Sequence, residues 1–461
     1  MLPAEVMHAL FGAASSWLPI FVVLALATSG AARLIDGPFV ARASAGVAYG
    51  WNPFVFDRLA VGQISVLAGY ALLPWLLHAC VARGTNAVPY RRMLLVAGWW
   101  AAAALCSLHF LWIGGVLVAA AAVVRRRELT GRHLAVIVGF VAAVVGTWLL
   151  IAHGGGSAGD ARALRTFGTT PDPDLGRSLG LLAEQGFWRP VVARPRDDLG
   201  VLFPFVACTL VAVGGIGLAV ARSKLAAVVA LAGAAGWLLA HGDAGPAGSI
   251  YRVLYAHVPG FAVMREAQKW DALVCLALAA GLGCAATAIT RTRWRRCAGA
   301  LILLPVALAP TLAWGLVGRI EPSRLPKSWH AVRDAADHID GDIVVLPWQL
   351  YVRPGVTGNR TIADPVGSYF GHRMLVSRDP IAPGLGGDTG RRADIAAAVR
   401  AAAADAAAGR PVHLGAALVH VGVGGVLVVN GAAEVPLERD PSLALAATAD
   451  HLALFAVVGK V

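Results

Sequence analysis

The residues best suited to chemistry lie in two stretches, GWNPFVFDRLAVGQ (residues 50–63) and SIYRVLYAHVPGFAVMREAQKWDA (residues 249–272). The first sets Asp57 beside Arg58 at the end of an apolar run. The second contains Arg252, Arg265, Glu266 and Lys269. Guanidinium groups bind phosphate oxygens through paired hydrogen bonds, and a carboxylate can take a proton from a hydroxyl group. Together the two stretches predict a phosphate-binding site with an acid–base group beside it.

We assign phosphate binding to four cations and name two acids beside them as candidate catalytic residues. The phosphate-binding residues are Arg58, Arg265, Lys269 and Arg252, and the acids are Asp57 and Glu266. The aromatics nearby are Trp51, Phe54, Phe56, Tyr251, Tyr255 and Trp270. An alternative interpretation is that these aromatic and basic residues only anchor helix ends at a membrane surface, with Asp57 and Arg58 forming a local ion pair.

Composition places both stretches in a polytopic membrane protein. The 461 residues are 57% hydrophobic and 14% charged, with a mean hydropathy of +0.66. The net charge is +12, but residues 319–461 contain 14 Lys and Arg against 14 Asp and Glu. The excess therefore lies in the apolar part, which is typical of loops between membrane helices and does not indicate nucleic-acid binding. The six cysteines show no disulfide or metal-ligand spacing.

Apolar windows predict about ten membrane-spanning helices. They cover residues 16–33, 38–54, 64–82, 93–107, 108–124, 134–152, 200–221, 225–241, 271–290 and 297–318. The window 38–54 is interrupted by Arg42 and Asn52, and the stretch 93–124 is compatible with one long kinked element or two helices.

The basic connections orient these windows. They contain Arg83, Arg91 and Arg92; Arg125, Arg126, Arg127 and Arg132; Arg222 and Lys224; and Arg291, Arg293, Arg295 and Arg296. The positive-inside rule places them in the cytoplasm. Residues 55–63, 153–199, 242–270 and the tail from 319 then lie outside, together with the N-terminus. Both stretches with candidate site residues thus border the same outer leaflet.

The first 32 residues contain no Lys or Arg, so no positive charge holds the start of the chain inside. Residues 3–14 predict a short amphipathic helix on the outer membrane surface. Two interpretations stay open: the reading frame begins one helix late, or the protein inserts with its N-terminus outside.

We predict two domains, a transmembrane domain over 1–318, with outer loops 153–199 and 242–270, and an extracytoplasmic α/β domain over 319–461. In the latter, β-like runs occupy 342–348, 417–423, 425–430 and 451–459, and an alanine-rich helix occupies 391–409. Its segment 353–373 has the Gly, Pro, Asn and Asp content of a loop. The many charges of 153–199 are typical of a solvated face, although EQGFWRP (184–190) is compatible with a return to the membrane.

Three stretches together resemble the large multi-pass GT-C type glycosyltransferases of actinobacteria and archaea, nearest the actinobacterial arabinofuranosyltransferase-like group. They are AYGWNPFVFDRLAVGQISVLAGYALLPWLL (48–77), VMREAQKWDALVCLALA (263–279) and VVLPWQLYVRPGVTGNRTIADPVGSYF (344–370). The resemblance implies a cell-membrane enzyme of cell-wall biogenesis. Such an enzyme moves a sugar, arabinofuranose or mannose being favoured, from a polyprenyl-phosphate donor to an envelope glycan.

The chain differs from that family in one respect. In that family an acidic residue on the first outer loop acts as general base or metal partner, and this chain begins after the place of that loop. Either the start is truncated, or Asp57 or Glu266 substitutes, or the chain has no transferase activity and is a membrane scaffold or a carrier of lipid-linked envelope precursors. The cofactor stays unknown, with a divalent cation left open.

Overall fold

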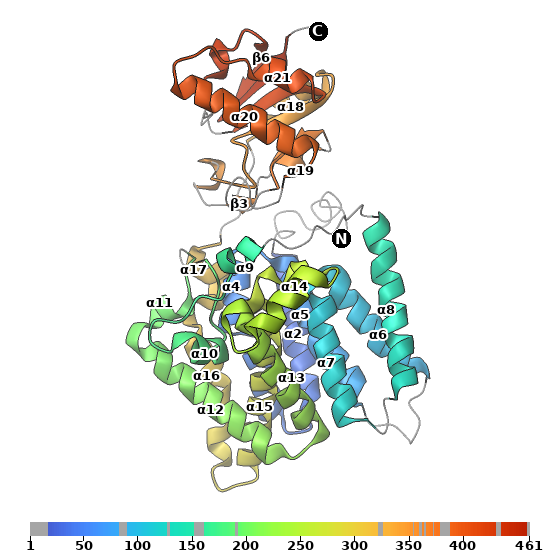
Figure 1. The fold of residues 1–461 in the computed structure, drawn as a ribbon. Helices are drawn as coiled ribbons and strands as arrows, with labels where there is room; N and C mark the ends of the chain where they lie inside the picture. The colour runs from blue at the N-terminus through green and yellow to red at the C-terminus, as the bar shows by residue number, and fades with distance from the viewer. Residues whose placement is uncertain are drawn as a thin grey trace. The chain divides into compact units, whose positions relative to one another are not determined.

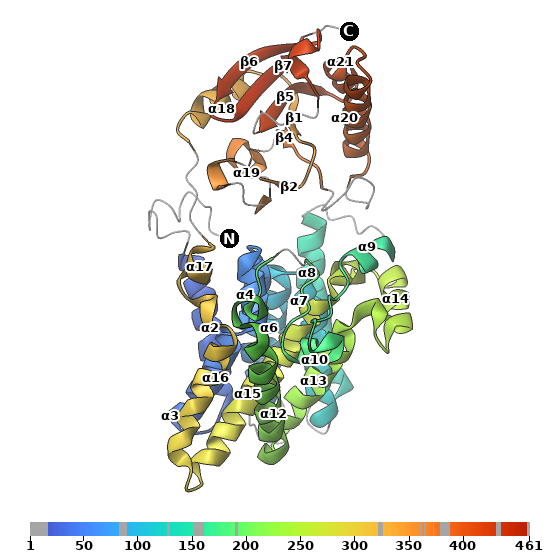
Figure 2. The same ribbon diagram turned by 90° about the vertical axis from the view of Figure 1, so that its left-hand side faces the viewer.

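A computed structural model describes residues 17–82, 90–126, 130–151, 161–189, 192–320, 326–353, 355–358, 362–363, 366–371, 373–378, 388–429 and 435–458. The chain divides into two compact units, Met1–Glu321 and Pro322–Val461. We describe each unit by itself (Figures 1 and 2). The predicted surface helix over residues 3–14 lies outside the described residues.

The first unit is a bundle of apolar helices. The long ones are α2 (Leu18–Leu34), α3 (Phe39–Gly50), α5 (Ile64–Val81), α6 (Tyr90–Cys106), α7 (His109–Val124), α8 (Gly131–Ile151), α12 (Phe203–Ala221), α13 (Lys224–Ala240) and α15 (Asp271–Thr290). Helix α15 packs most extensively against α12, α3 and α13, and it is buried along most of its length. Its sequence is apolar on every side, as a helix surrounded by other helices requires.

Glycines let α12 and α15 approach backbone to backbone. A Cβ atom added at Gly217 would lie 1.9 Å from the carbonyl oxygen of Gly281. One added at Gly281 would lie 2.1 Å from the carbonyl oxygen of Gly214. Small residues at such crossings are how helices associate in a bilayer, where no hydrophobic effect drives them together.

Among the described residues, three helical stretches are long and apolar enough to cross a membrane: Ile64–Val81, Pro195–Ala221 and Ala267–Thr290. Shorter apolar helices cover Leu18–Leu34, His109–Val124, Gly131–Thr147 and Lys224–Ala240. A mostly helical chain with apolar helices is therefore confirmed, while the number of about ten spans stays a prediction.

Two predicted windows, 38–54 and 297–318, are divided in the structure, and the windows 93–107 and 108–124 are two helices as predicted. The window 38–54 contains α3, which ends at Gly50, and the start of a separate helix, α4 (Pro53–Ala60). Asn52 and Pro53 begin this new helix. The stretch 93–124 forms two helices, α6 and α7. The window 297–318 is broken into η6 (Arg295–Gly299), α16 (Ala300–Leu308), η7 (Pro310–Leu312) and α17 (Ala313–Gly318).

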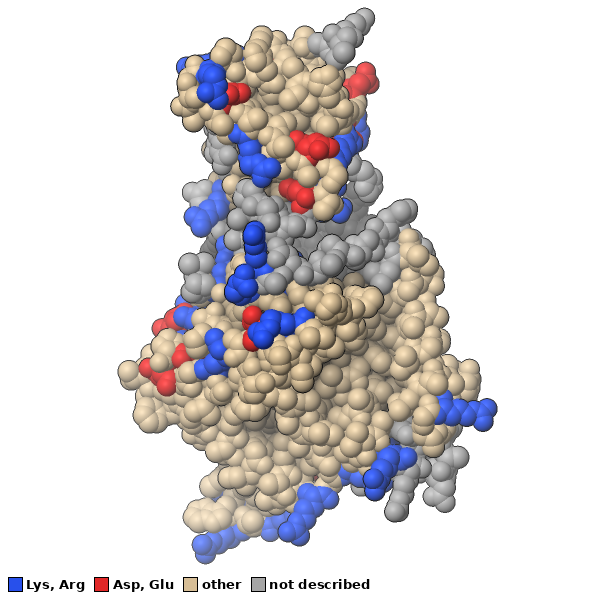
Figure 3. All heavy atoms as spheres, in the orientation of Figure 1, with Lys and Arg blue, Asp and Glu red and all other residues tan. Residues whose placement is uncertain are grey.

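Short helices accompany the long ones: α9 (Ala161–Thr166), α10 (Gly176–Leu182), α11 (Pro195–Leu199), η2 (Gly200–Leu202), η3 (Gly242–Ala244), α14 (Gly248–His257), η4 (Phe261–Arg265) and η5 (Ala267–Trp270). Of these, α9 and α14 lie toward the upper end of the first unit in Figure 2. On the face seen in Figure 3, acidic and basic side chains both occur toward this end of the first unit. Its middle is uncharged there, and the charged side chains at its opposite end are Lys or Arg.

The second unit is a sheet between two helical layers. Its strands β1 (Asp342–Leu346), β4 (Met374–Leu375), β5 (Val423–Val429), β6 (Leu443–Ala449) and β7 (Leu452–Val457) lie in the order β4-β1-β5-β7-β6. Strand β1 is parallel to β4 and β5, whereas β7 is antiparallel to β5 and β6. Alternate residues face opposite layers: Val344 packs with α20 (Arg391–Ala407) and Ile343 with α18 (Trp329–Asp337).

This unit agrees with the predicted mixture of helix and strand, but one run was assigned to the wrong element and several elements, among them β4, β6 and α18, were not predicted. The run 417–423 was predicted as a strand, but α21 (Leu414–Val419) ends there and a turn at Gly422 leads into β5. Short apolar runs do not distinguish strand from buried helix by period alone. Strand β6 was not predicted, because its alanine-rich sequence has low β-propensity. The segment 353–373 contains η8 (Gly355–Thr357), β3 (Ile362–Ala363), which pairs with β2 (Tyr351–Val352), and α19 (Val366–Phe370).

Candidate active site

Asp57 and Arg58 lie on α4, a helix of about two turns that begins at Asn52 and Pro53. The side-chain oxygen of Asn52 accepts a hydrogen bond from a first-turn backbone amide at 2.9 Å, which caps the helix. The side-chain nitrogen of Asn52 donates to the hydroxyl of Tyr70 on α5 at 2.9 Å. The cap therefore fixes α4, and with it Asp57 and Arg58, against a long apolar helix.

Arg58 is fully surrounded by protein, with 1% of its surface exposed. Its Nη1 donates to Oε1 of Gln63 at 3.0 Å and lies 3.5 Å from Oε2 of Glu266. Its guanidinium carbon lies 4.8 Å from the ring centroid of Phe54 and 4.9 Å from that of Phe187. Aromatic faces stabilise a buried guanidinium without neutralising it, so Arg58 keeps its positive charge.

Glu266 and Lys269 stand opposite Arg58, around the junction of η4 and η5. Nζ of Lys269 lies 3.2 Å from Oε1 of Glu266 and donates to Nε2 of His109 at 2.9 Å. Nδ1 of His109 in turn lies 2.8 Å from the hydroxyl of Ser107. Two cations thus share one carboxylate within a buried hydrogen-bonded chain.

The structure brings together some of the predicted site residues and leaves others apart. Arg58, Glu266 and Lys269 meet although more than 200 positions separate Arg58 from the other two in the sequence. The guanidinium of Arg265 faces the ring of Phe167 at 4.5 Å, within electrostatic range of Lys269. Arg252 is exposed, and its Nη1 donates to a backbone carbonyl at 3.3 Å.

The two predicted acids have opposite electrostatic environments. Burial raises the pKa of Asp57 to about 7, although the nearby charges of Arg58 and Arg194 act to lower it. Burial acts in the same direction on Glu266, but the charges of Lys269 and Arg58 outweigh it and lower the pKa of Glu266 to about 2. Oδ1 of Asp57 has no hydrogen-bond partner among the described residues. Asp57 therefore exchanges a proton near neutral pH, whereas Glu266 stays charged.

Four polar residues that the sequence analysis did not single out are buried in the same unit. They are Glu184, Gln185, Gln268 and Asp271, each less than a tenth exposed. Glu184 and Gln185 open the EQGFWRP stretch, whose Phe187 contacts Arg58. The first residues of that stretch are therefore buried within the protein and not solvated, and its return to the membrane stays a prediction. The interruption of a charged loop by a short Gly- and aromatic-containing segment is the only local signal in the sequence.

Chemically, the arrangement offers a buried anion site next to a proton acceptor. Two cations and one acid leave a net charge of about one positive unit, which favours an anionic ligand. Among the described residues, no three His, Cys, Asp or Glu side chains lie close enough together to hold a metal ion.

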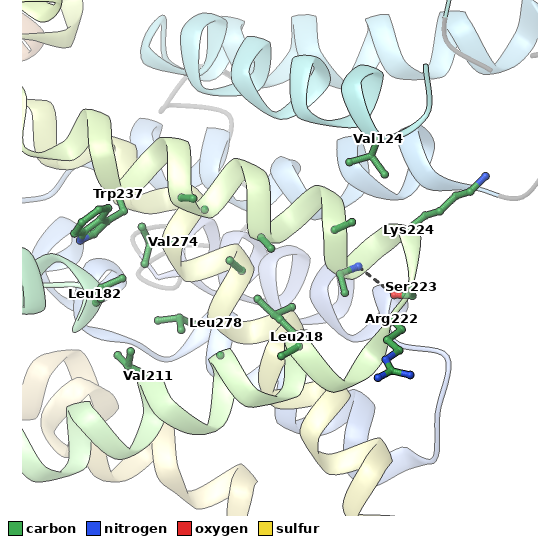
Figure 4. A pocket seen from close by; sticks show the side chains of 18 residues that line it. Val124, Leu182, Val211, Leu218, Arg222, Ser223, Lys224, Trp237, Val274 and Leu278 are labelled. Atoms are coloured by element: carbon green, nitrogen blue, oxygen red, sulfur yellow. Dashed lines mark hydrogen bonds between the residues drawn. The ribbon is translucent and has the colours of Figure 1, made fainter. Parts of the chain in front are cut away.

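A separate groove of about 830 Å³ lies between α12, α13 and α15 (Figure 4). Its walls are almost entirely apolar and include Val211, Leu218, Val274 and Leu278. One end is bordered by Leu182 and Trp237, and the other by Arg222, Ser223 and Lys224. The groove thus extends from Leu182 and Trp237 to a basic connection.

The sequence matches no protein-family profile and no curated protein. The fold does match solved structures. Over 100% of this chain and 35% of the other, it resembles the cryo-EM structure of arabinofuranosyltransferase AftD from Mycobacteria, with a TM-score of 0.65 and 18% identity. A mutant of the same protein, in its class 2 structure, gives a TM-score of 0.61 and 17% identity over 100% and 37% of the two chains.

The chain therefore spans about a third of the length of the solved structures that it matches. The likeness covers the whole chain, which confirms at the level of the fold the resemblance expected from residues 48–77, 263–279 and 344–370. At this identity it shows the fold alone.

Proposed function

We propose that this protein is a membrane glycosyltransferase that moves a sugar from a polyprenyl-phosphate donor to an envelope glycan. The observation that carries the proposal is the buried cluster of Arg58, Lys269 and Glu266 beside Asp57, at the end of an apolar helical bundle. A fold shared with an arabinofuranosyltransferase supports it, and makes arabinofuranose the favoured sugar, with mannose the other candidate.

Arg58 and Lys269 are proposed to hold the donor phosphate. A polyprenyl-phosphate sugar is a phosphodiester with one negative charge, which balances the net positive charge of the cluster. Nε of Arg58 has no hydrogen-bond partner among the described residues, so this donor is available to a phosphate oxygen. Arg265 is proposed to complete the site from the Phe167 ring, within electrostatic range of Lys269. Arg252, exposed on α14, is proposed to attract the donor at the surface.

Asp57 is proposed as the general base, and Glu266 as the counter-ion that holds the two cations in place. A base must be able to take a proton near the working pH, which the pKa of about 7 allows for Asp57 and the pKa of about 2 opposes for Glu266. The acceptor hydroxyl attacks the anomeric carbon while its proton passes to Asp57. The bond from that carbon to the phosphate oxygen breaks, and the second negative charge on the departing polyprenyl phosphate is stabilised by Arg58 and Lys269.

We propose a multi-pass arrangement of about ten spans in an actinobacterial cell membrane, with the site and the unit Pro322–Val461 outside the cytoplasm. The concentration of Lys and Arg at one end of the bundle supports this orientation (Figure 3). The apolar groove of Figure 4 has walls suited to a lipid chain, which fits a lipid-linked donor.

The proposal is tested with membranes that contain the full chain and a decaprenyl-phosphate donor carrying labelled arabinofuranose or mannose. We expect transfer of label to an envelope glycan by the wild type, loss of at least about a hundredfold in Asp57→Asn, and no change in the exposed control Asp394→Asn. No transfer of either sugar by the wild type would refute the proposal. Binding of the donor without transfer would instead identify a carrier of lipid-linked precursors.

A further inference from the structure

A set of four buried polar residues has no role in the proposed transfer step. Both side-chain polar atoms of Gln185 and both of Gln268 have no hydrogen-bond partner among the described residues. The same holds for Oε2 of Glu184 and Oδ1 of Asp271. Gln185 is 3% exposed and Gln268 is 1% exposed, so bulk solvent does not reach them in this conformation.

These four residues come from two segments that lie together. A Cβ atom added at Gly186 would lie 3.8 Å from Cβ of Gln268, which places the 184–186 segment against η5. The carboxyl of Glu184 hydrogen-bonds with Cys275 on α15, one helical turn after Asp271. Asp271 interacts electrostatically with Glu184, Arg58 and Asp57. The set is therefore continuous with the proposed transfer site.

Folding alone does not account for this set. A buried amide without a partner destabilises a protein, and an apolar side chain of similar size would remove that cost. The backbone is also strained at Glu184, which has a φ of 60°, and Gly186 has a φ of 130° that favours glycine. A Cβ atom added at Gly186 would lie 2.9 Å from a methyl group of Thr169, so the turn also requires glycine for space. Strain and unpaired polar groups at one place are typical of a binding site.

The residue types decide which ligand fits. Amides donate and accept hydrogen bonds without charge, and burial raises the pKa of Glu184 to about 8, so its carboxyl carries a proton at neutral pH and can also do both. The set contains no Lys or Arg that would balance the negative charge of a phosphate. Vicinal hydroxyl groups, which also both donate and accept, match this set.

We propose that Glu184, Gln185, Gln268 and Asp271 form a subsite that binds the hydroxyl groups of the sugar being transferred. The inference rests on the proposed function and deepens it, because the subsite then selects the sugar while Arg58 and Lys269 hold the phosphate. Phe187, which follows Gln185 by two residues, contacts Arg58 and so connects the two parts of the site.

The test compares a lipid with and without its sugar. The purified full chain in lipid nanodiscs is titrated with decaprenyl phosphate, with decaprenyl-phosphoryl arabinofuranose and with decaprenyl-phosphoryl mannose. The variants are Gln185→Leu and Gln268→Leu, with Gln349→Leu, exposed in the other unit, as the matched control. We expect each variant to weaken binding of the preferred sugar-bearing lipid at least about tenfold and to change binding of decaprenyl phosphate less than about threefold.

Thermal unfolding of the same variants distinguishes a sugar-binding role of the glutamines from a structural role. Loss of an unpaired amide should leave the melting temperature unchanged or raise it, whereas a structural role would lower it and leave the preference for sugar-bearing lipid intact. That structural outcome overturns the proposal, as does an equal loss of affinity for all three lipids. Should the variants not fold, wild-type protein is titrated with deoxy analogues of the preferred sugar lipid. Equal affinity for every analogue overturns the subsite alone, and failure of wild type to bind any of the lipids overturns the proposed function with it.

Discussion

Replacing Glu266 with glutamine should strongly destabilise the protein, because it leaves Arg58 and Lys269 buried without their shared carboxylate. The pKa of this carboxyl falls from 4.5 to about 2 on folding. At about 1.36 kcal/mol for each pH unit, this difference corresponds to about 3 kcal/mol of stability at neutral pH. Breaking a buried ion pair from one side costs about 3–5 kcal/mol, in agreement with that figure.

The loss of stability in Glu266→Gln should depend on pH. Because folding lowers the pKa of Glu266, its contribution is present above pH 4.5 and is lost as the pH falls toward about 2. The free energy of unfolding is measured by denaturant titration in detergent micelles for wild type, Glu266→Gln and the exposed control Glu438→Gln. We expect a loss of about 3 kcal/mol for Glu266→Gln at pH 7 that shrinks toward pH 3. A loss below about 1 kcal/mol, or one as large in the control, would refute the ion-pair geometry.

Three further predictions follow from other features. If Asp57 is the base, the kcat/KM for transfer should fall as the pH drops below about 7, because the carboxyl becomes protonated; a flat profile from pH 5 to 8 would exclude it. Gly186→Ala should lower the affinity for sugar-bearing lipid, since a methyl group there meets Thr169 and the φ of 130° disfavours alanine; wild-type affinity would contradict the strained turn. Gly217→Leu should prevent α12 from packing on α15 and lower the melting temperature, whereas Gly215→Leu, with open space around its Cβ position, should not; equal melting temperatures would contradict the close helix crossing.

Much of the helical layout follows from the sequence because apolar length is a local property. The windows 64–82 and 271–290 coincide closely with α5 and α15. Other boundaries depend on single residues: Asn52 and Pro53 end one window early, and Pro310 follows the break after α16. The error at 417–423 has a different cause, since an apolar run of seven residues fits the end of a helix followed by a strand as well as one strand.

Part of the candidate site could also be predicted from the sequence. The pairing of Arg58 with Glu266 and Lys269 follows from placing both stretches on one side of the membrane, which the arginine distribution allows. Gln185 and Gln268 give no such signal, because a buried glutamine and a solvated one look identical in a charged loop. Only the packing of the 184–186 segment against η5 reveals them.

The most direct test of the central claim is the affinity of the full chain in nanodiscs for decaprenyl phosphate after Lys269→Met. The substitution keeps an unbranched side chain but removes one of the two cations, so Glu266 then neutralises Arg58. The account predicts a dissociation constant at least about tenfold higher than that of wild type, with no change for the exposed control Lys327→Met. Equal affinity of Lys269→Met and wild type would contradict it.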